Sequence, residues 1–169
     1  METRAGMEHS WDELDQYRGA YFCGQWPSII DMLLITESTF GHRPAFTVFT
    51  PERVTLTFTE VVDNVRRVGS ALAEAGVERG DRVVINGKNS PEWAIAYLAT
   101  LWIGAVVVPL DNQMPCSRME SLSAFVEASY LFADKNIIEA LDQTQAWYQR
   151  LKGCATLLGA SDDIAPIGG

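Results

Sequence analysis

The sequence has few cysteines and histidines. Its three cysteines, Cys23, Cys116 and Cys154, lie far apart, and no C-x-x-C spacing occurs. An odd number of cysteines without a zinc-binding or redox spacing indicates unpaired thiols in a reducing compartment, so we expect a cytoplasmic protein. The two histidines, His9 and His42, are too few and too far apart for a metal site, and no metal ligands are predicted.

Positive charge is also scarce. Thirteen Lys and Arg residues stand against 22 Asp and Glu residues, which gives a formal net charge of −9. The basic residues are scattered, and Arg66 and Arg67 form the only adjacent pair. Because binding to a phosphate backbone needs clustered Lys and Arg, nucleic acid is not an expected partner. The acidity is interpreted as a contribution to solubility.

No segment has the pattern of a signal peptide or a membrane span. The first ten residues are polar and lack an apolar core. The longest apolar run, Trp93–Leu110, contains Thr100, Gly104 and Pro109, and its second half is rich in valine. This pattern favours a helix followed by a strand over a membrane-spanning helix. With 169 residues, 47% of them hydrophobic, the chain can form one domain or one subdomain with its own core.

Helix start and stop signals recur along the chain. The segment Thr57-x-x-Glu60 has the pattern of a capping box, in which each side chain accepts from a free backbone amide of the first turn. Gly41, Gly76 and Gly104 stand where helices are expected to end. The predicted N-caps are Ser28, Thr57, Ser90, which is followed by Pro91, and Ser117, with Asp134 or Asn136 opening a last helix. The residues expected to face inward on the last two helices are Met119, Leu122, Phe125, Val126, Ile137, Ile138, Leu141 and Trp147.

Short runs rich in Val, Ile and aromatic residues predict strands between these helices. The predicted strands are 45–50, 54–58, 82–86, 105–109, 130–132 and 155–158, the first two forming a hairpin around a turn at 51–53. Strands that alternate with helices predict an α/β fold with a mainly parallel sheet and helices on both faces. The expected organisation is an N-terminal arm at 1–25, an α/β subdomain at 26–158 and a loose tail at 159–169.

Two motifs carry a resemblance to a known family. The segment Leu56–Val61 reads LTFTEV, and the segment Leu101–Asp111 reads LWIGAVVVPLD, with a glycine stop, an apolar strand and a turn at Pro109 and Asp111. Together with the connections at 76–83 and 89–93, they resemble the adenylate-forming (AMP-binding) enzymes, the acyl-CoA synthetases and their relatives. The segment 109–115 is most similar to bacterial long-chain fatty-acid ligases. The resemblance covers residues 26–135 and implies the N-terminal subdomain of that enzyme fold.

The resemblance implies a reaction in which a fatty acid, ATP and coenzyme A give acyl-CoA, AMP and pyrophosphate, with Mg²⁺ bound. The family's phosphate loop, a Ser/Thr/Gly run ending in Pro-Lys-Gly, has no match here, and no lysine follows Lys152. The adenine and ribose motifs and the C-terminal lysine would lie beyond Gly169. We therefore expect an N-terminal structural subdomain without catalytic, cofactor-binding or metal-binding residues of its own. ATP, Mg²⁺ and CoA are implied only for the full-length enzyme.

Two other functions are compatible with these motifs. One is part of an adenylation domain for an amino or aryl acid, and the other is a free-standing binding module that reuses the fold. The expected partners are the remainder of the parent enzyme and a second copy of the chain, which would form a symmetric dimer through exposed apolar surface. Peripheral membrane contact of the parent enzyme is a further expectation.

Three sets of residues have both a functional and a structural interpretation. The loop 87–90 lies between a strand and a helix N-terminus, where an anion can bind, but it also fits a solvated turn with a serine cap. Asp81 and Asp111 are candidate general bases or turn residues, and neither has a histidine near it in sequence. The aromatic residues Trp93, Tyr97 and Trp102 would line an acyl pocket or pack in a core. We prefer the structural interpretation for each set.

Overall fold

The structure, a computed structural model, describes residues 27–49 and 52–157. The expected arm at 1–25 and tail at 159–169 lie outside these residues. The elements in chain order are α1 (Ile29–Phe40), β1 (Pro44–Val48), β2 (Val54–Thr57), α2 (Phe58–Glu74), β3 (Arg82–Asn86), α3 (Pro91–Trp102), β4 (Val106–Leu110), α4 (Cys116–Phe125), β5 (Tyr130–Ala133), α5 (Lys135–Ala140), α6 (Ala146–Gln149) and β6 (Gly153–Thr156).

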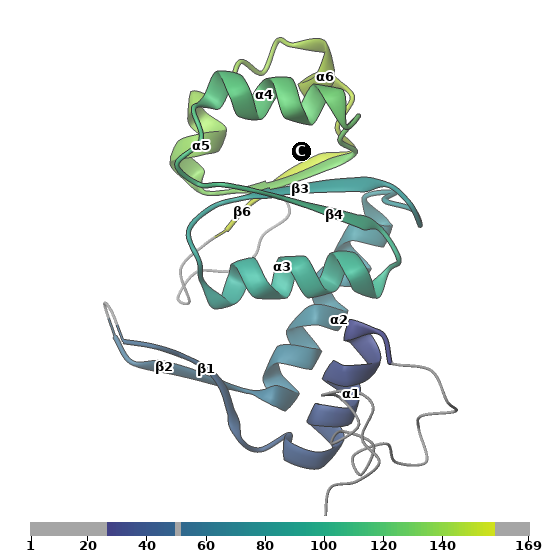
Figure 1. The fold of residues 1–169 in the computed structure, drawn as a ribbon, viewed down its shortest axis with the longest axis vertical. Coiled ribbons are helices and arrows are strands. Elements are labelled where there is room, and N and C mark those ends of the chain that lie inside the picture. Colours follow the sequence, from purple (N-terminus) through teal and green to yellow (C-terminus); the bar gives the residue numbers. More distant parts are fainter. Residues whose placement is uncertain (1–26, 50–51, 158–169) are drawn as a thin grey trace, which may run out of the picture.

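The strands form two sheets, as expected for an α/β fold with an N-terminal hairpin (Figure 1). Strands β1 and β2 pair antiparallel, with Thr47 opposite Thr55. The other four strands are parallel, in the order β4-β3-β5-β6. Val84 on β3 lies opposite Val108 on one side and Leu131 on the other. The predicted fold class is therefore confirmed.

Helices cover both faces of the parallel sheet. In Figure 1, α2 and α3 lie on one side of the sheet, and α4, α5 and α6 lie on the other. Side chains alternate along a strand, so Val83 and Ile85 pack toward α2 and α3 while Val84 packs on the opposite face with Met119. The two layers of core are thus separated by β3 and β5, the two interior strands.

The predicted capping chemistry is confirmed at the first three helices. The Thr57 hydroxyl accepts from the Glu60 amide at 3.3 Å, and the Glu60 carboxylate accepts from the Thr57 amide at 2.7 Å. Ser28 and Asp31 form the same box before α1. Gly76 has a φ of +83°, the left-handed conformation expected after a helix end. Each cap contributes about 1 kcal/mol to helix stability.

Strand β4 is an edge strand, although its wholly apolar sequence is typical of a strand buried within a parallel sheet. Val106 is 48% exposed, and Pro109 is also exposed. The Val106 amide donates to the Asp81 carbonyl at 2.7 Å, so the backbone groups of Val106 face β3. Successive residues of a strand direct their backbone groups to opposite sides, so those of Pro109, three residues on, face the open edge. Proline has no amide hydrogen and is tolerated where that position faces an open edge. An apolar sequence alone does not distinguish an edge strand from a central one.

The start and the inward face of α4 differ from the prediction. Pro115, not Ser117, occupies the N-cap position, and Ser117 lies within the first turn. Phe125, expected to face inward, is 83% exposed. Met119 sets the buried side of this helix, and at 3.6 residues per turn Phe125 lies about 120° away from it. The spacing from Met119 to Phe125 therefore places the phenylalanine off the buried stripe.

The last predicted helix is two separate short helices. Between α5 and α6, Leu141 has an extended backbone with ψ of 143°. The Asp142 carboxylate then accepts from both the amide and the hydroxyl of Thr144, at 3.0 and 2.6 Å. Such a local bond offers the backbone an alternative to continuing the helix. Ile138, Leu141 and Trp147 are nevertheless buried, as predicted.

One buried hydroxyl offers a stability test. Ser123 on α4 is fully buried, and its Oγ has no hydrogen-bond partner among the described residues. We expect Ser123→Ala to raise the free energy of unfolding by about 1 kcal/mol, because it removes an unsatisfied polar group. Chemical denaturation measures the change. Ser70→Ala, at an exposed position in α2, is the matched control and should gain only the helix-propensity difference of about 0.5 kcal/mol. Equal gains from both variants would contradict the expectation.

Candidate functional site

The strand order places a candidate site at the carboxyl ends of β3 and β5. The crossover from β3 through α3 leads to one side of β3, and the crossover from β4 through α4 leads to its other side. The point between β3 and β5, where the two connections leave in opposite directions, is a topological switch point. In open α/β sheets, ligands commonly bind in the crevice at such a point. The loop at 87–90 follows β3, and Asp134 follows β5, so both lie at this position.

Protein groups fill the switch point. The Asp134 carboxylate accepts from the Lys88 amide at 3.1 Å, and the Asp134 amide donates to the Asn86 carbonyl at 3.2 Å. Gly87 is buried, and a Cβ placed on it would lie 2.6 Å from the Leu157 side chain and 2.7 Å from Asp134 Oδ1. The close approach of these side chains requires glycine here and leaves no room for a phosphate group between them.

The loop 87–90 fits the solvated turn with a serine cap. Ser90 Oγ accepts from the Trp93 amide at 3.1 Å, and Pro91 occupies the first position of α3. The Lys88 amide, which an anion would need, already donates to a carboxylate. The negative charge of Asp134 disfavours a second anion at this position. The structural interpretation of the loop therefore agrees with these contacts.

Asp111 and Asp81 lie at opposite ends of the sheet, and the carboxylate of each accepts from a nearby backbone amide and so stabilises a turn. After β4, the Asp111 carboxylate accepts from the Gln113 amide at 2.9 Å. The Asp111 carbonyl accepts from the buried side-chain amide of Asn86, also at 2.9 Å, which ties the ends of β3 and β4 together. Asn86 was not singled out from the sequence, since a polar residue at a strand end carries no signal of burial.

The opposite end of the sheet contains a charged cluster that the sequence did not indicate. Lys152, just before β6, donates to Asp81 Oδ2 and to the Gly76 carbonyl, both at 2.7 Å. Asp81 Oδ2 also accepts from the Glu78 amide at 2.8 Å. This amide and, next, the Lys152 hydrogen bond hold the pKa of Asp81 below its usual value. The arrangement joins the start of β6 to the connection between α2 and β3.

The aromatic residues and cysteines have packing roles in the structure. Trp93 and Tyr97 stack with ring centroids 5.5 Å apart, and both pack against the core beneath α2 and α3. Trp102 packs against the same core, as preferred from the sequence. Cys154 lies 3.3 Å from the Tyr148 hydroxyl, and burial, with a smaller effect of this thiol, raises the pKa of Tyr148 to about 12. Within 27–49 and 52–157, cysteines 116 and 154 are unpaired.

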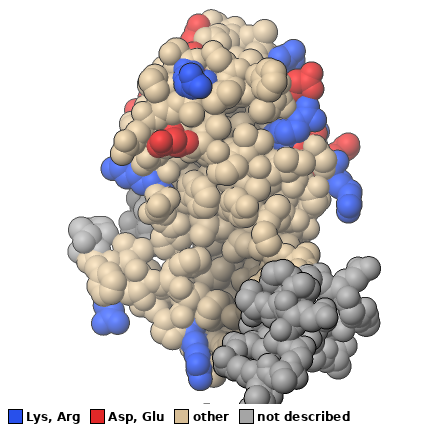
Figure 2. Space-filling model, viewed as in Figure 1, with Lys and Arg blue, Asp and Glu red and all other residues tan. Residues whose placement is uncertain are grey.

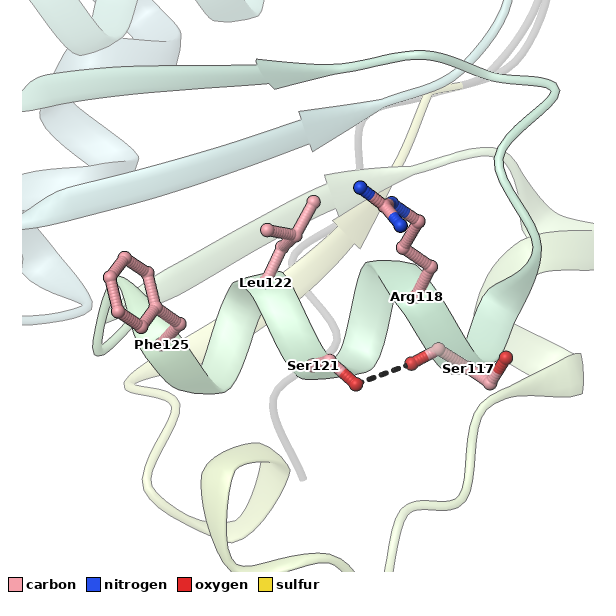
Figure 3. A pocket seen from close by; sticks show the side chains of 5 residues that line it. All are labelled: Ser117, Arg118, Ser121, Leu122 and Phe125. Carbon is pink, nitrogen blue, oxygen red and sulfur yellow. Dashed lines mark hydrogen bonds between the residues drawn. The ribbon is translucent and has the colours of Figure 1, made fainter.

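Other features of the described chain also bear on function. No group of three or more His, Cys, Asp or Glu side chains within it could hold a metal ion. No helix among these residues is long and apolar enough to cross a membrane. On the face shown in Figure 2, basic and acidic side chains are interspersed around the parallel sheet. A hollow of about 550 Å³ lies along α4, lined by Ser117, Arg118, Ser121, Leu122 and Phe125 (Figure 3).

Two curated proteins illustrate the sequence similarity. A ligase of Streptomyces coelicolor named L-proline--[L-prolyl-carrier protein] ligase is 34% identical over 108 residues, which are 64% of this chain and 20% of that protein. Long chain acyl-CoA synthetase 1 of Arabidopsis thaliana is 32% identical over 110 residues, 64% of this chain and 17% of that protein. The chain thus spans a fifth or less of the length of these two relatives.

A solved structure and a family model extend the comparison over more of the chain. An anthranilate CoA ligase, solved in complex with anthranoyl-AMP, matches 78% of this chain and 25% of its own, with a TM-score of 0.69 and 21% identity, a likeness of fold. The family model for the AMP-binding enzyme matches residues 36–163, which includes the whole parallel sheet. The chain belongs to the AMP-binding enzyme family, whose members include adenylate-forming ligases.

Proposed function

We propose that this chain is a scaffold part of an ATP-dependent acid–thiol ligase and that it forms no acyl-adenylate by itself. The observation that supports this proposal is that the acidic side chains at the strand ends are hydrogen-bonded to the chain's own backbone. Asp81, Asp111 and Asp134 each accept from a backbone amide of the chain itself. Carboxylates held in this way fix loops, and among residues 27–49 and 52–157 none of the three has a hydrogen bond to a histidine or to a second carboxylate, the partners that acid–base catalysis uses.

ATP, Mg²⁺ and CoA are the cofactors that the family implies for the whole ligase. A nucleotide-bound Mg²⁺ needs one or two free carboxylates beside the phosphates, whereas the carboxylates of Asp81, Asp111 and Asp134 each already accept from a backbone amide of the chain. The phosphate-binding Ser/Thr/Gly loop ending in Pro-Lys-Gly is also without a match in the sequence. We therefore assign no step of the reaction to residues of this chain.

A long-chain fatty acid is the substrate that we propose for the ligase. The support is the similarity to long chain acyl-CoA synthetase 1 of Arabidopsis thaliana at 32% identity, together with the segment 109–115. An amino or aryl acid is the second candidate. It is favoured by the similarity to a proline-activating ligase at 34% identity. Relatives with different acids share this part of the fold, so the choice of acid depends on other residues.

Exchange of pyrophosphate into ATP tests the proposal. The purified 169-residue chain should show no acid-dependent exchange with palmitate, anthranilate or proline. Acid-dependent exchange by this chain would overturn the scaffold role. The complete product of the gene is then assayed with the same three acids. Exchange with palmitate supports the fatty-acid ligase, and a preference for proline or anthranilate supports the second candidate.

A further inference from the structure

The outer side of α4 presents an exposed stripe. Phe125, at 83%, has the largest exposed fraction among the large apolar side chains that the structure describes. Arg118, Leu122 and Phe125 are spaced four and three residues apart, which places them on one side of a helix. Figure 3 shows Arg118 and Leu122 on the same side of α4, with Phe125 near its end. These three residues are called the α4 stripe.

A hole lies beside Phe125 on the same helix. Ser117, Arg118, Ser121, Leu122 and Phe125 line this open hollow of about 550 Å³, and the two serines leave space because their side chains are small. The Ser121 hydroxyl already donates to the Ser117 carbonyl at 2.8 Å, so an apolar occupant leaves it satisfied. The hollow has room for an apolar side chain of a facing helix.

We propose that the α4 stripe is a homodimer contact, in which Phe125 of each copy enters the hole on the other. An antiparallel pair of α4 helices with a two-fold axis beside Leu122 brings the partner's Phe125 opposite the residues between 117 and 122. The axis makes the contact reciprocal, as a symmetric dimer requires. The Arg118 guanidinium then lies over the partner's Phe125 ring, an attractive cation–π contact.

The other exposed phenylalanines already have such a contact within the chain. The Arg43 guanidinium lies 4.7 Å from the ring centroid of Phe40, and that of Arg53 lies 5.8 Å from the ring centroid of Phe49. No cation or aromatic ring is found on Phe125 among the residues that the structure describes. Arg118 and Phe125 are thus a complementary pair that one copy does not bring together, which favours a second copy as the occupant.

Sedimentation across a wide range of concentration tests the dimer. The unmodified chain should pass from monomer to dimer, and Phe125→Ser should weaken the association about tenfold or more, as at a central interface residue. Arg118→Gln should weaken it several-fold. Phe49→Ser is the matched control, since it removes another highly exposed phenylalanine, from the hairpin, and should leave the association unchanged. A monomer at every concentration, or equal effects of Phe125→Ser and Phe49→Ser, would overturn the proposal.

A cross-link locates the axis even if the Phe125 variant does not fold. A cysteine at position 122 lies next to its own copy across the proposed axis, so Leu122→Cys should give a reducible dimer on oxidation, above the level of the unmodified chain. Ser70→Cys, on the exposed side of α2, should not. Equal cross-linking of both variants, or none at position 122, would refute the two-fold contact at α4. Neither experiment measures ATP–pyrophosphate exchange, so failure of the dimer and failure of the proposed function can be told apart.

Discussion

Replacing Ile85 with alanine is expected to lower the free energy of unfolding by about 2–5 kcal/mol. Ile85 is fully buried in β3, which is paired on both sides by β4 and β5. Its side chain belongs to the core beneath α2 and α3, where deletion leaves a cavity that the sheet backbone cannot close. The expected loss is a large share of the 5–15 kcal/mol that typically stabilises a domain.

The measurement for Ile85→Ala is urea denaturation followed by circular dichroism. Ile29→Ala is the matched control, because Ile29 is the same residue type but 51% exposed at the start of α1. The control should change the free energy of unfolding by about 0.5 kcal/mol or less. If the two variants differed by less than the measurement error, the assignment of Ile85 to the main core would be wrong.

Removing the charge of Asp81 is expected to destabilise the chain and to change its pH dependence. Asp81→Asn weakens the bonds to the Glu78 amide and to Lys152. The expected loss at neutral pH is about 1–2 kcal/mol, since the Lys152 side chain is 34% exposed and solvent screens the pair. The substitution also leaves the Lys152 ammonium beside a neutral amide, which is a weaker acceptor than a carboxylate.

The sign of the pH effect follows from the lowered pKa. The Asp81 pKa is lower in the folded chain than its ordinary value of 3.8, so the folded state binds the proton less readily than the unfolded state. The stabilisation is therefore complete above pH 3.8 and is lost as the pH falls through the folded-state pKa. Denaturation between neutral and acidic pH should show a shallower fall for Asp81→Asn than for the unmodified chain.

The matched control is Asp63→Asn. Asp63 pairs with Arg66 at 3.3 Å on the surface of α2, and its side chain is 65% exposed. An exposed pair of this kind contributes about 0–1 kcal/mol. The control should keep the pH profile of the unmodified chain, and a profile as shallow as that of Asp81→Asn would show that the Lys152 cluster has no special role.

Local signals predicted the helix starts and stops correctly where all the partners lie within one turn. Thr57 and Glu60 satisfy each other's backbone amides over three residues, and Gly76 adopts the left-handed conformation directly after α2. Two of the failures depend on distant residues, whereas the start of α4 at Pro115 and the break between α5 and α6 involve only neighbouring residues. Whether β4 lies at an edge depends on the strand order, and whether Phe125 is buried depends on which side of α4 meets the sheet.

The candidate site was predictable in its turns but not in its partners. The serine cap at Ser90 and the turn at Asp111 follow from neighbouring residues. The bond from Lys88 to Asp134 joins residues 46 positions apart, and the one from Lys152 to Asp81 joins residues 71 positions apart. Such pairs form because parallel strands bring their like ends together, and a single sequence contains no periodic pattern that marks them.

The strand order has a consequence for folding during synthesis. β3 is made before both of its neighbours, and β4 reaches the ribosome exit before β5 does. The unit β3–α3–β4 therefore closes first, through partners near in sequence, while the second edge of β3 and the sheet face under α4 wait for more distant partners. During that interval the nascent chain presents Val84 and an unpaired strand edge, the kinds of surface that make a folding intermediate prone to aggregation.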